Sequence, residues 1–269
     1  MDNLEYKDLL DAGVHFGHMT RKWNPKIAPY VFMERNGIHI IDLNKTLVSL
    51  NDAADAVKNI VRSGRKIMFV ATKKQAQEVV TEEAQRLRMP YVTDRWLGGM
   101  LTNFATIRKS LRKMSSIEKM TKEESYQNLA KRERLMLSRE QEKLQKVLGG
   151  IADLTRLPAA LFVVDIKREH IAIREAQKLN IPVIAMVDTN SDPTQVQFPI
   201  PANDDAFKSI SLIIKYIGQA VEEGIVERKQ QKEEAKMKEE EDKKRAVDQP
   251  DAEESQETAP VSATSEENQ

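Results

Sequence analysis

Two segments of the sequence place an indole among cations and amides, a combination that suits contact with a polyanion. In the first segment, Trp23 lies between Arg21 and Lys22 on one side and Asn24 and Lys26 on the other. Cationic and amide groups bind phosphates, and an indole stacks on a base or a ribose. We predict RNA contact by these five residues. The alternative is a surface loop whose tryptophan packs on the protein itself.

The second segment, residues 95–104, combines hydrogen-bond donors with two adjacent glycines. Paired glycines permit a close approach of the backbone to a ligand, or alternatively a tight turn. An indole at position 96 can likewise lie in the hydrophobic core rather than against a base. The residues predicted to contact RNA in this segment are Arg95, Trp96, Gly98, Gly99, Thr102 and Asn103.

Basic residues supply two further sets of candidate RNA contacts. Lys73 and Lys74 follow the carboxyl end of an expected strand, and residues 105–148 contain 12 basic against 6 acidic residues. The whole chain has 42 of each sign, so its overall balance conceals this basic segment. Such an excess indicates a polyanionic partner, although a solvated helix face is the alternative. The candidates in the basic segment are Arg108, Lys109, Arg112 and Lys113.

Histidines and aspartates offer a possible metal site. Asp165 and Asp188 each end an apolar run, and the carboxyl ends of parallel strands meet at one edge of a sheet. We favour the alternative that such aspartates cap helices and turns, and we predict no metal and no other cofactor. Chain-wide absence of cysteine excludes thiolate ligands. The residues whose metal binding the sequence leaves open are His15, His18, Asp188, Asp192, Asp204 and Asp205.

Motifs of common enzymes of α/β folds are absent. The sequence contains neither of the two glycine-rich phosphate-binding motifs, G-x-G-x-x-G after the first expected strand or G-x-x-x-x-G-K-[ST], and no G-x-S-x-G nucleophile turn. The expected sheet is typical of enzymes, but the usual nucleotide-binding motifs of such enzymes are missing. The alternative is an α/β enzyme or metal-binding protein that uses the carboxyl ends of the strands. No apolar run is long enough to cross a membrane, and the expected location is the cytoplasm.

Hydrophobic patterning predicts the elements that position these residues. Continuous apolar runs at residues 67–71, 161–164 and 183–187 are typical of strands that helices cover on both faces. Two weaker strand candidates lie at residues 90–92 and 198–200. Helical patterns follow the three strong runs, and their positions are residues 75–87, 169–179 and 205–226. Alternating strands and helices predict an α/β sandwich with a parallel sheet.

The N-terminal region follows a different pattern. Asn36 and Gly37 lie between two apolar runs, which is a strong signal for a β-hairpin. We expect a helix at residues 4–12 and a loop at residues 13–29 before the hairpin, and a helix at residues 43–62 after it.

Residues 105–148 interrupt the alternation with two helical patterns. Each has one narrow apolar seam, which predicts an antiparallel helical hairpin in the manner of a coiled coil. We predict three parts: a discontinuous α/β body (residues 1–104 and 149–226), a hairpin arm (105–148) and a charged tail (227–269). The tail is expected to extend the last helix and then to be disordered.

Three blocks of the sequence resemble one known family. The first comprises residues 10–18 and the run from Arg21 to Lys26, the second residues 95–104, and the third residues 158–182. In order and spacing they resemble the signatures of the bacterial small-subunit ribosomal protein S2 family over about residues 3–226. The charged tail lies outside this resemblance.

The resemblance implies both a fold and a role. It implies a Rossmann-like α/β body that bears a helical hairpin and assembly onto small-subunit ribosomal RNA. It also implies no catalysed reaction, and hence no catalytic residue, no small-molecule substrate and no enzymatic activity. It also implies contacts with neighbouring ribosomal proteins, among them protein S1. We therefore expect a structural ribosomal protein that supports translation in the cytoplasm.

Overall fold

A computed structural model of the chain describes residues 4–123, 126 and 129–247. The chain divides into two compact units, Met1–Arg228 and Lys229–Gln269. The predicted disorder of residues beyond about 246 falls almost entirely outside the described residues. No helix in the described part of the chain is both long and apolar enough to cross a lipid bilayer.

The first unit is built on a five-stranded parallel sheet with the strand order β5-β4-β6-β7-β8. The three strong apolar runs form its central strands, and the two weaker candidates form its edges. This arrangement confirms the predicted α/β fold with a parallel sheet. The strands are β4 (Ile67–Val70), β5 (Tyr91–Val92), β6 (Ala160–Val164), β7 (Val183–Val187) and β8 (Phe198–Pro201).

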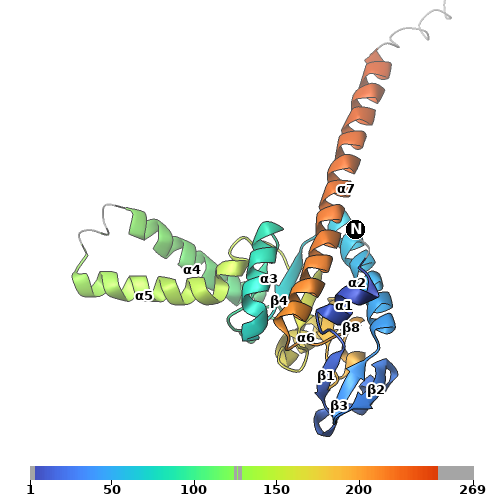
Figure 1. The fold of residues 1–269 in the computed structure, drawn as a ribbon. Helices are drawn as coiled ribbons and strands as arrows, with labels where there is room; N and C mark the ends of the chain where they lie inside the picture. The colour runs from blue at the N-terminus through green and yellow to red at the C-terminus, as the bar shows by residue number, and fades with distance from the viewer. Residues whose placement is uncertain (1–3, 124–125, 127–128, 248–269) are drawn as a thin grey trace, which may run out of the picture. The chain divides into compact units, whose positions relative to one another are not determined.

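Helices cover both faces of this sheet (Figure 1). Successive strand residues point to opposite faces, so Phe69 and Phe162 pack in one apolar cluster while Met68 and Leu161 pack in another. Helices α2 (Leu43–Arg62), α3 (Lys74–Arg86) and α7 (Phe207–Val247) contribute to the first cluster, and α6 (His170–Lys178) to the second. Burial on both faces explains why the strands are continuously apolar.

A smaller antiparallel sheet with the order β1-β3-β2 precedes α2. The predicted hairpin is confirmed, with Asn36 and Gly37 at φ values of 54° and 71° between β2 (Val31–Arg35) and β3 (Ile38–Ile41). The expected loop at residues 13–29 is partly wrong, because β1 (Phe16–Met19) and 3-10 turns at Thr20–Lys22 and Pro25–Tyr30 lie there. Strand β1 forms by pairing with β3, which no local pattern reveals. Helix α1 (Tyr6–Asp11) precedes it.

Helices α4 (Phe104–Lys122) and α5 (Lys131–Leu148) lie side by side where the sequence predicts a helical hairpin (Figure 1). Apolar residues of α4, such as Ile107 and Leu111, belong to the same cluster as strands β4 and β6. The base of the helix pair is therefore packed on the sheet. Residues 124–125 and 127–128 of the connection lie outside the described residues, and the division of the chain into body, arm and tail stays a prediction.

Candidate nucleic-acid interface

The glycine-containing segment, residues 95–104, is organised around one buried carboxylate, that of Glu175. One carboxylate oxygen, Oε1, accepts hydrogen bonds from Trp96 Nε1 (3.1 Å) and from the backbone N–H of Gly99 (2.7 Å). The other, Oε2, accepts from the backbone N–H of Leu101 (2.9 Å) and from both the N–H (3.0 Å) and the hydroxyl (3.1 Å) of Thr102. Five donors from one loop thus converge on one side chain.

These hydrogen bonds determine the charge state of Glu175. Burial alone would raise the pKa of its carboxyl group, but hydrogen bonds from the N–H groups of Thr102, Gly99 and Leu101 hold the pKa below its usual value. The side chain is 8% exposed. It is therefore a buried anion whose charge is compensated by N–H and O–H dipoles.

Sequence reasoning did not assign Glu175 to the site, although a signal was present. On α6, Ala172, Ile173 and Ala176 are buried against the sheet. Position 175 lies on the same face, three residues after Ala172. A glutamate within a buried apolar stripe needs a partner, and that need marks it as a residue with a specific task.

The predicted contact residues of this segment divide into exposed and buried ones. Arg95, Gly98, Thr102 and Asn103 are exposed, whereas Trp96 is buried with its N–H already donated. No atom lies within 4 Å of a Cβ built on Gly98, so its backbone is open to a ligand. Gly99 has a φ of 89°, and its N–H donates a hydrogen bond to Glu175. This glycine therefore lies in a tight turn, which the sequence analysis gave as the alternative to contact with a ligand.

The four basic candidates on α4 lie on the outer side of that helix. Arg108, Lys109, Arg112 and Lys113 are all exposed, while Ile107, Leu111 and Met114 between them are buried. Lys113 forms an ion pair with Glu140 of α5. Within the part of the chain that the structure describes, the other three cations are in no ion pair, so a polyanion can reach them.

The first predicted segment lies at the edge of the small sheet. Arg21, Lys22 and Lys26 are exposed, and the ring of Trp23 is 39% exposed and lies 4.8 Å from that of His39. Asn24 is partly buried and has a structural role: its side chain accepts a hydrogen bond from the N–H of Lys26 (3.0 Å). Lys26 also forms an ion pair with Asp192 (2.7 Å).

Lys73 and Lys74 differ in surroundings. Lys74 begins α3 and is exposed, but Lys73 is buried beside three carboxylates, with its Nζ 2.7 Å from Asp204, 2.6 Å from Asp205 and 3.7 Å from Asp165. Burial would lower the pKa of Lys73, and these carboxylates raise it instead. Its ammonium group therefore neutralises acidic groups of the protein, and its part in RNA binding stays a prediction.

Asp188 follows β7 and Asp204 follows β8, so the topology of the parallel sheet brings these two carboxylates together. His18 joins them from β1 of the small sheet. Each offers one ligand atom, and the three atoms lie within 4.8 Å of one another. His18 Nδ1 is 3.1 Å from Asp188 Oδ2, and the fully buried Asp204 Oδ2 has no hydrogen-bond partner among the residues that the structure describes. Imidazole and carboxylate ligands in this arrangement could hold a divalent cation such as zinc. The prediction of no metal is not tested by this geometry.

Burial and neighbouring charged groups shift the pKa values of His18 and Asp204. The hydrogen bond with Asp188 raises the pKa of His18. Burial and the neighbouring carboxylates Asp188 and Asp165 raise the pKa of Asp204 to about 7.

Of the remaining metal candidates, Asp205 lies beside this group of three ligand atoms, with its Oδ2 3.4 Å from His18 Nε2. Asp192 caps a 3-10 turn by accepting a hydrogen bond from the N–H of Thr194, as the capping alternative predicts. Asp205 is paired with Lys73, and His15 stacks on Phe16 with ring centroids 4.0 Å apart.

Sequence reasoning also missed a polar groove beside α6. Its cavity has a volume of about 480 Å³; His170 and Arg174 line it from α6, and Lys167 lines it from the turn before that helix. Asn24 and Asn190 add amide groups from neighbouring loops. The available signal was that His170 and Arg174 are four positions apart on the expected helix and so share one face of it.

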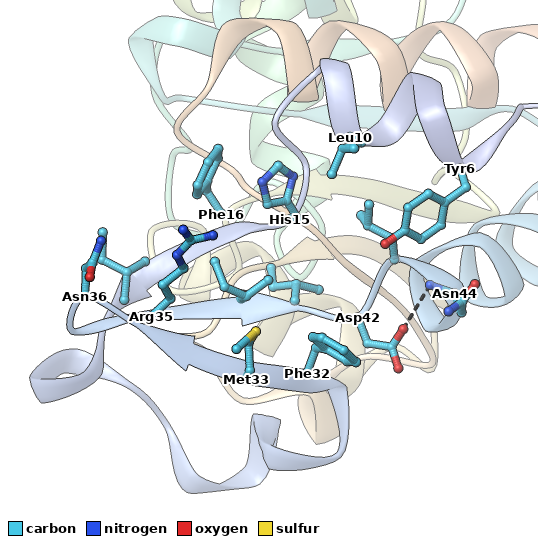
Figure 2. Close-up of a pocket in the computed structure, with 14 residues that line it drawn as sticks. Tyr6, Leu10, His15, Phe16, Phe32, Met33, Arg35, Asn36, Asp42 and Asn44 are labelled. Atoms are coloured by element: carbon cyan, nitrogen blue, oxygen red, sulfur yellow. Dashed lines mark hydrogen bonds between the residues drawn. The ribbon is translucent and has the colours of Figure 1, made fainter.

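A second groove, between α1 and the small sheet, is apolar (Figure 2). Its cavity volume is about 650 Å³, and Tyr6, Phe16, Phe32 and Met33 line it while remaining 48%, 49%, 69% and 48% exposed, respectively. Exposed apolar surface of this kind is typical of protein-binding sites rather than of contacts with nucleic acid.

Comparisons with known proteins give one consistent result. The model of the family described as "Ribosomal protein S2" matches residues 9–224. A "Small ribosomal subunit protein uS2" of Cytophaga hutchinsonii is 73% identical over 91% of this chain and 96% of its own length. Proteins with the same description from Flavobacterium johnsoniae and Bacteroides thetaiotaomicron are 62% and 60% identical over 86% of this chain, covering 91% and 84% of their own lengths.

Proposed function

Because the chain belongs to the ribosomal protein S2 family, we propose that it is a structural component of the small ribosomal subunit and supports translation in the cytoplasm. The observation that carries this proposal is the family match, which spans residues 9–224 and so covers nearly all of the first compact unit. The family consists of structural ribosomal proteins, so the alternative of an α/β enzyme is not supported.

We propose that ribosomal RNA binds the exposed members of the predicted contact set. Four groups of exposed residues support this: the cations of the first segment, the exposed residues of segment 95–104, Lys74 at the start of α3, and the cations on α4. Backbone phosphates of RNA are bound by cationic and amide groups, which these groups supply. The residues proposed are Arg21, Lys22, Trp23, Lys26, Lys74, Arg95, Gly98, Thr102, Asn103, Arg108, Lys109, Arg112 and Lys113.

The predicted division into body, arm and tail is part of this proposal. In this proposal, residues 105–148 form an RNA-binding arm. Helix α4 exposes its cations and buries its apolar residues against the body and α5.

Cosedimentation tests the proposed function. An affinity-tagged copy of the chain expressed in its own cells should sediment with small ribosomal subunits and remain bound after washing at moderate salt. A matched tagged enzyme of similar size serves as the control for trapping. Recovery of the chain only in the soluble fraction, with subunits present, would refute a ribosomal role.

Neighbouring ribosomal proteins are the second class of proposed partner, and we include protein S1 among them. The family resemblance implies that partner, and the apolar groove of Figure 2 is the surface that suits a protein. Phe32 is the most exposed of its aromatic residues. Phe32→Ser should therefore reduce the capture of S1 by subunits while leaving incorporation of this chain intact.

A matched control removes an exposed apolar residue outside the groove. Val48 of α2 is 62% exposed and does not line the groove, so Val48→Ser should leave S1 capture unchanged. Equal capture by both variants would show that S1 binds elsewhere.

A further inference from the structure

The hydrogen bonds around Glu175 connect a buried residue of α6 to the start of α4. The loop that they hold leads directly into that helix: the N–H of Asn103 donates to the carbonyl of Gly99 (2.9 Å), and the N–H of Thr106 donates to the carbonyl of Asn103 (3.0 Å). Gly99 is thus bonded on one side to Glu175 and on the other to the residue that precedes α4. The position of the carboxylate therefore sets the position of the first turn of α4.

The chemistry of this contact specifies a carboxylate of this length. All five groups that point at Glu175 are N–H or O–H donors, and an ionised carboxylate accepts hydrogen bonds through both oxygens without donating any. A glutamine has one acceptor oxygen and one NH₂ group. Some of the loop's N–H or O–H donors would therefore face another donor and lose their hydrogen bonds. An aspartate is shorter by one methylene and cannot reach the same N–H groups from α6.

An anion beside an RNA-binding surface would ordinarily weaken binding by repelling phosphates. Here the carboxylate is buried and surrounded by donors, so its charge is compensated within the protein. Outward of it, Arg95, Gly98 and Asn103 remain exposed. The carboxylate consequently holds the loop through its buried donors, while these three residues remain available to a ligand.

We propose that Glu175 is a positioning residue for RNA binding: it makes no contact with RNA, and it holds residues 96–102 and the first turn of α4 in the conformation that binds the phosphate backbone. This inference rests on the proposed function. Without the carboxylate, the loop samples other conformations, and the apparent dissociation constant rises in inverse proportion to the binding-competent fraction.

The test compares Glu175→Gln with Arg95→Gln in binding to small subunits depleted of this protein, over a range of salt concentrations. If the loop of Glu175→Gln is in its RNA-binding conformation about a tenth of the time, binding weakens about tenfold at every salt concentration. Its log–log salt dependence should stay parallel to that of the parent, because no phosphate contact is lost. Arg95→Gln removes a cation that we propose contacts phosphate, so its slope should fall by roughly 0.7 to 0.9.

Amide hydrogen exchange provides the structural readout on the same proteins. The N–H groups of Gly99, Leu101 and Thr102 should be protected in the parent and exchange faster in Glu175→Gln, while amides of β6 and β7 remain protected. Should Glu175→Gln fail to fold, Trp96→Phe removes a single donor and should show the same parallel weakening to a smaller degree.

Three results separate the possibilities. Normal binding by folded Glu175→Gln with faster loop exchange would overturn the inference and leave the proposed function intact. A reduced salt slope for Glu175→Gln would also overturn it, because the slope reports a lost phosphate contact. Failure of the parent chain to bind depleted subunits would instead refute the proposed function.

Discussion

Three cations on α4 that form no ion pair within the described residues allow the RNA-binding proposal to be tested quantitatively. Arg108, Lys109 and Arg112 are exposed on α4, opposite Ile107 and Leu111, which are buried. Replacing the three cations with glutamine removes their charge and leaves the apolar contacts of the helix unchanged. We expect the variant to fold normally and to bind small subunits more weakly, with a shallower dependence on salt.

The expected change in the salt dependence of binding, and the expected loss of affinity, follow from counterion release. Each phosphate contact contributes roughly 0.7 to 0.9 to the log–log slope of affinity against salt, so three contacts contribute about 2 to 3. At about 0.1 M salt, this corresponds to a loss of affinity on the order of 10²-fold. Lys113 already pairs with Glu140. Replacing Lys113 should therefore change the slope less than replacing any one of the other three cations.

Sedimentation of labelled protein with subunits depleted of it, between roughly 50 and 500 mM salt, measures this slope. A control variant with the same charge change replaces Lys7, Lys208 and Lys215, which are exposed on α1 and α7. The control should keep the parent's slope. A slope unchanged in the α4 variant, or reduced equally in both variants, would refute the reasoning that α4 contacts phosphates.

Three further predictions concern stability. Gly98→Ala should leave the melting temperature unchanged because no atom lies within 4 Å of the added Cβ, whereas Gly99→Ala should cost about 1 to 2 kcal/mol because its φ is 89°; equal losses in thermal denaturation would contradict this. Lys73→Met should lower the free energy of unfolding by about 3 to 5 kcal/mol because it leaves carboxylates unpaired, and adding Asp204→Asn should recover part of the loss in urea denaturation; a purely additive double variant would argue against the pair. Since hydrogen bonds hold the pKa of Glu175 below its ordinary 4.5, its stabilisation is present above that pH and lost as pH falls through the lowered pKa. The stability difference between the parent and Glu175→Gln, measured in urea, should therefore shrink on acidification, and a difference independent of pH would refute this.

Patterns within short stretches of sequence determined most of the fold. Helix α2 was predicted at residues 43–62 and is found at Leu43–Arg62, because its apolar residues recur with the helical period. Asn36 and Gly37 predicted the hairpin because both tolerate a positive φ. The central strands were recognisable because burial on both faces makes every position of β6 and β7 apolar.

Contacts between distant segments could not be predicted in the same way. Strand β1 was missed because its four residues form a strand only by pairing with β3. Lys73 was predicted to contact RNA from its residue type and its place after a strand, but it is buried beside carboxylates that lie more than 90 positions away in the sequence. Residue type alone does not report which neighbours the fold supplies.

The candidate site shows the same division between sequence and tertiary structure. The sequence by itself identified which residues can bind a polyanion, since charge and hydrogen-bonding capacity belong to the side chain. Only the tertiary structure decided which of them face solvent: Arg95 and Arg108 do, whereas Trp96 donates its N–H to Glu175. The physical reason is that a buried donor or acceptor must find a partner, and that partner is supplied by the packing of α6 against the loop, 79 positions apart in the chain.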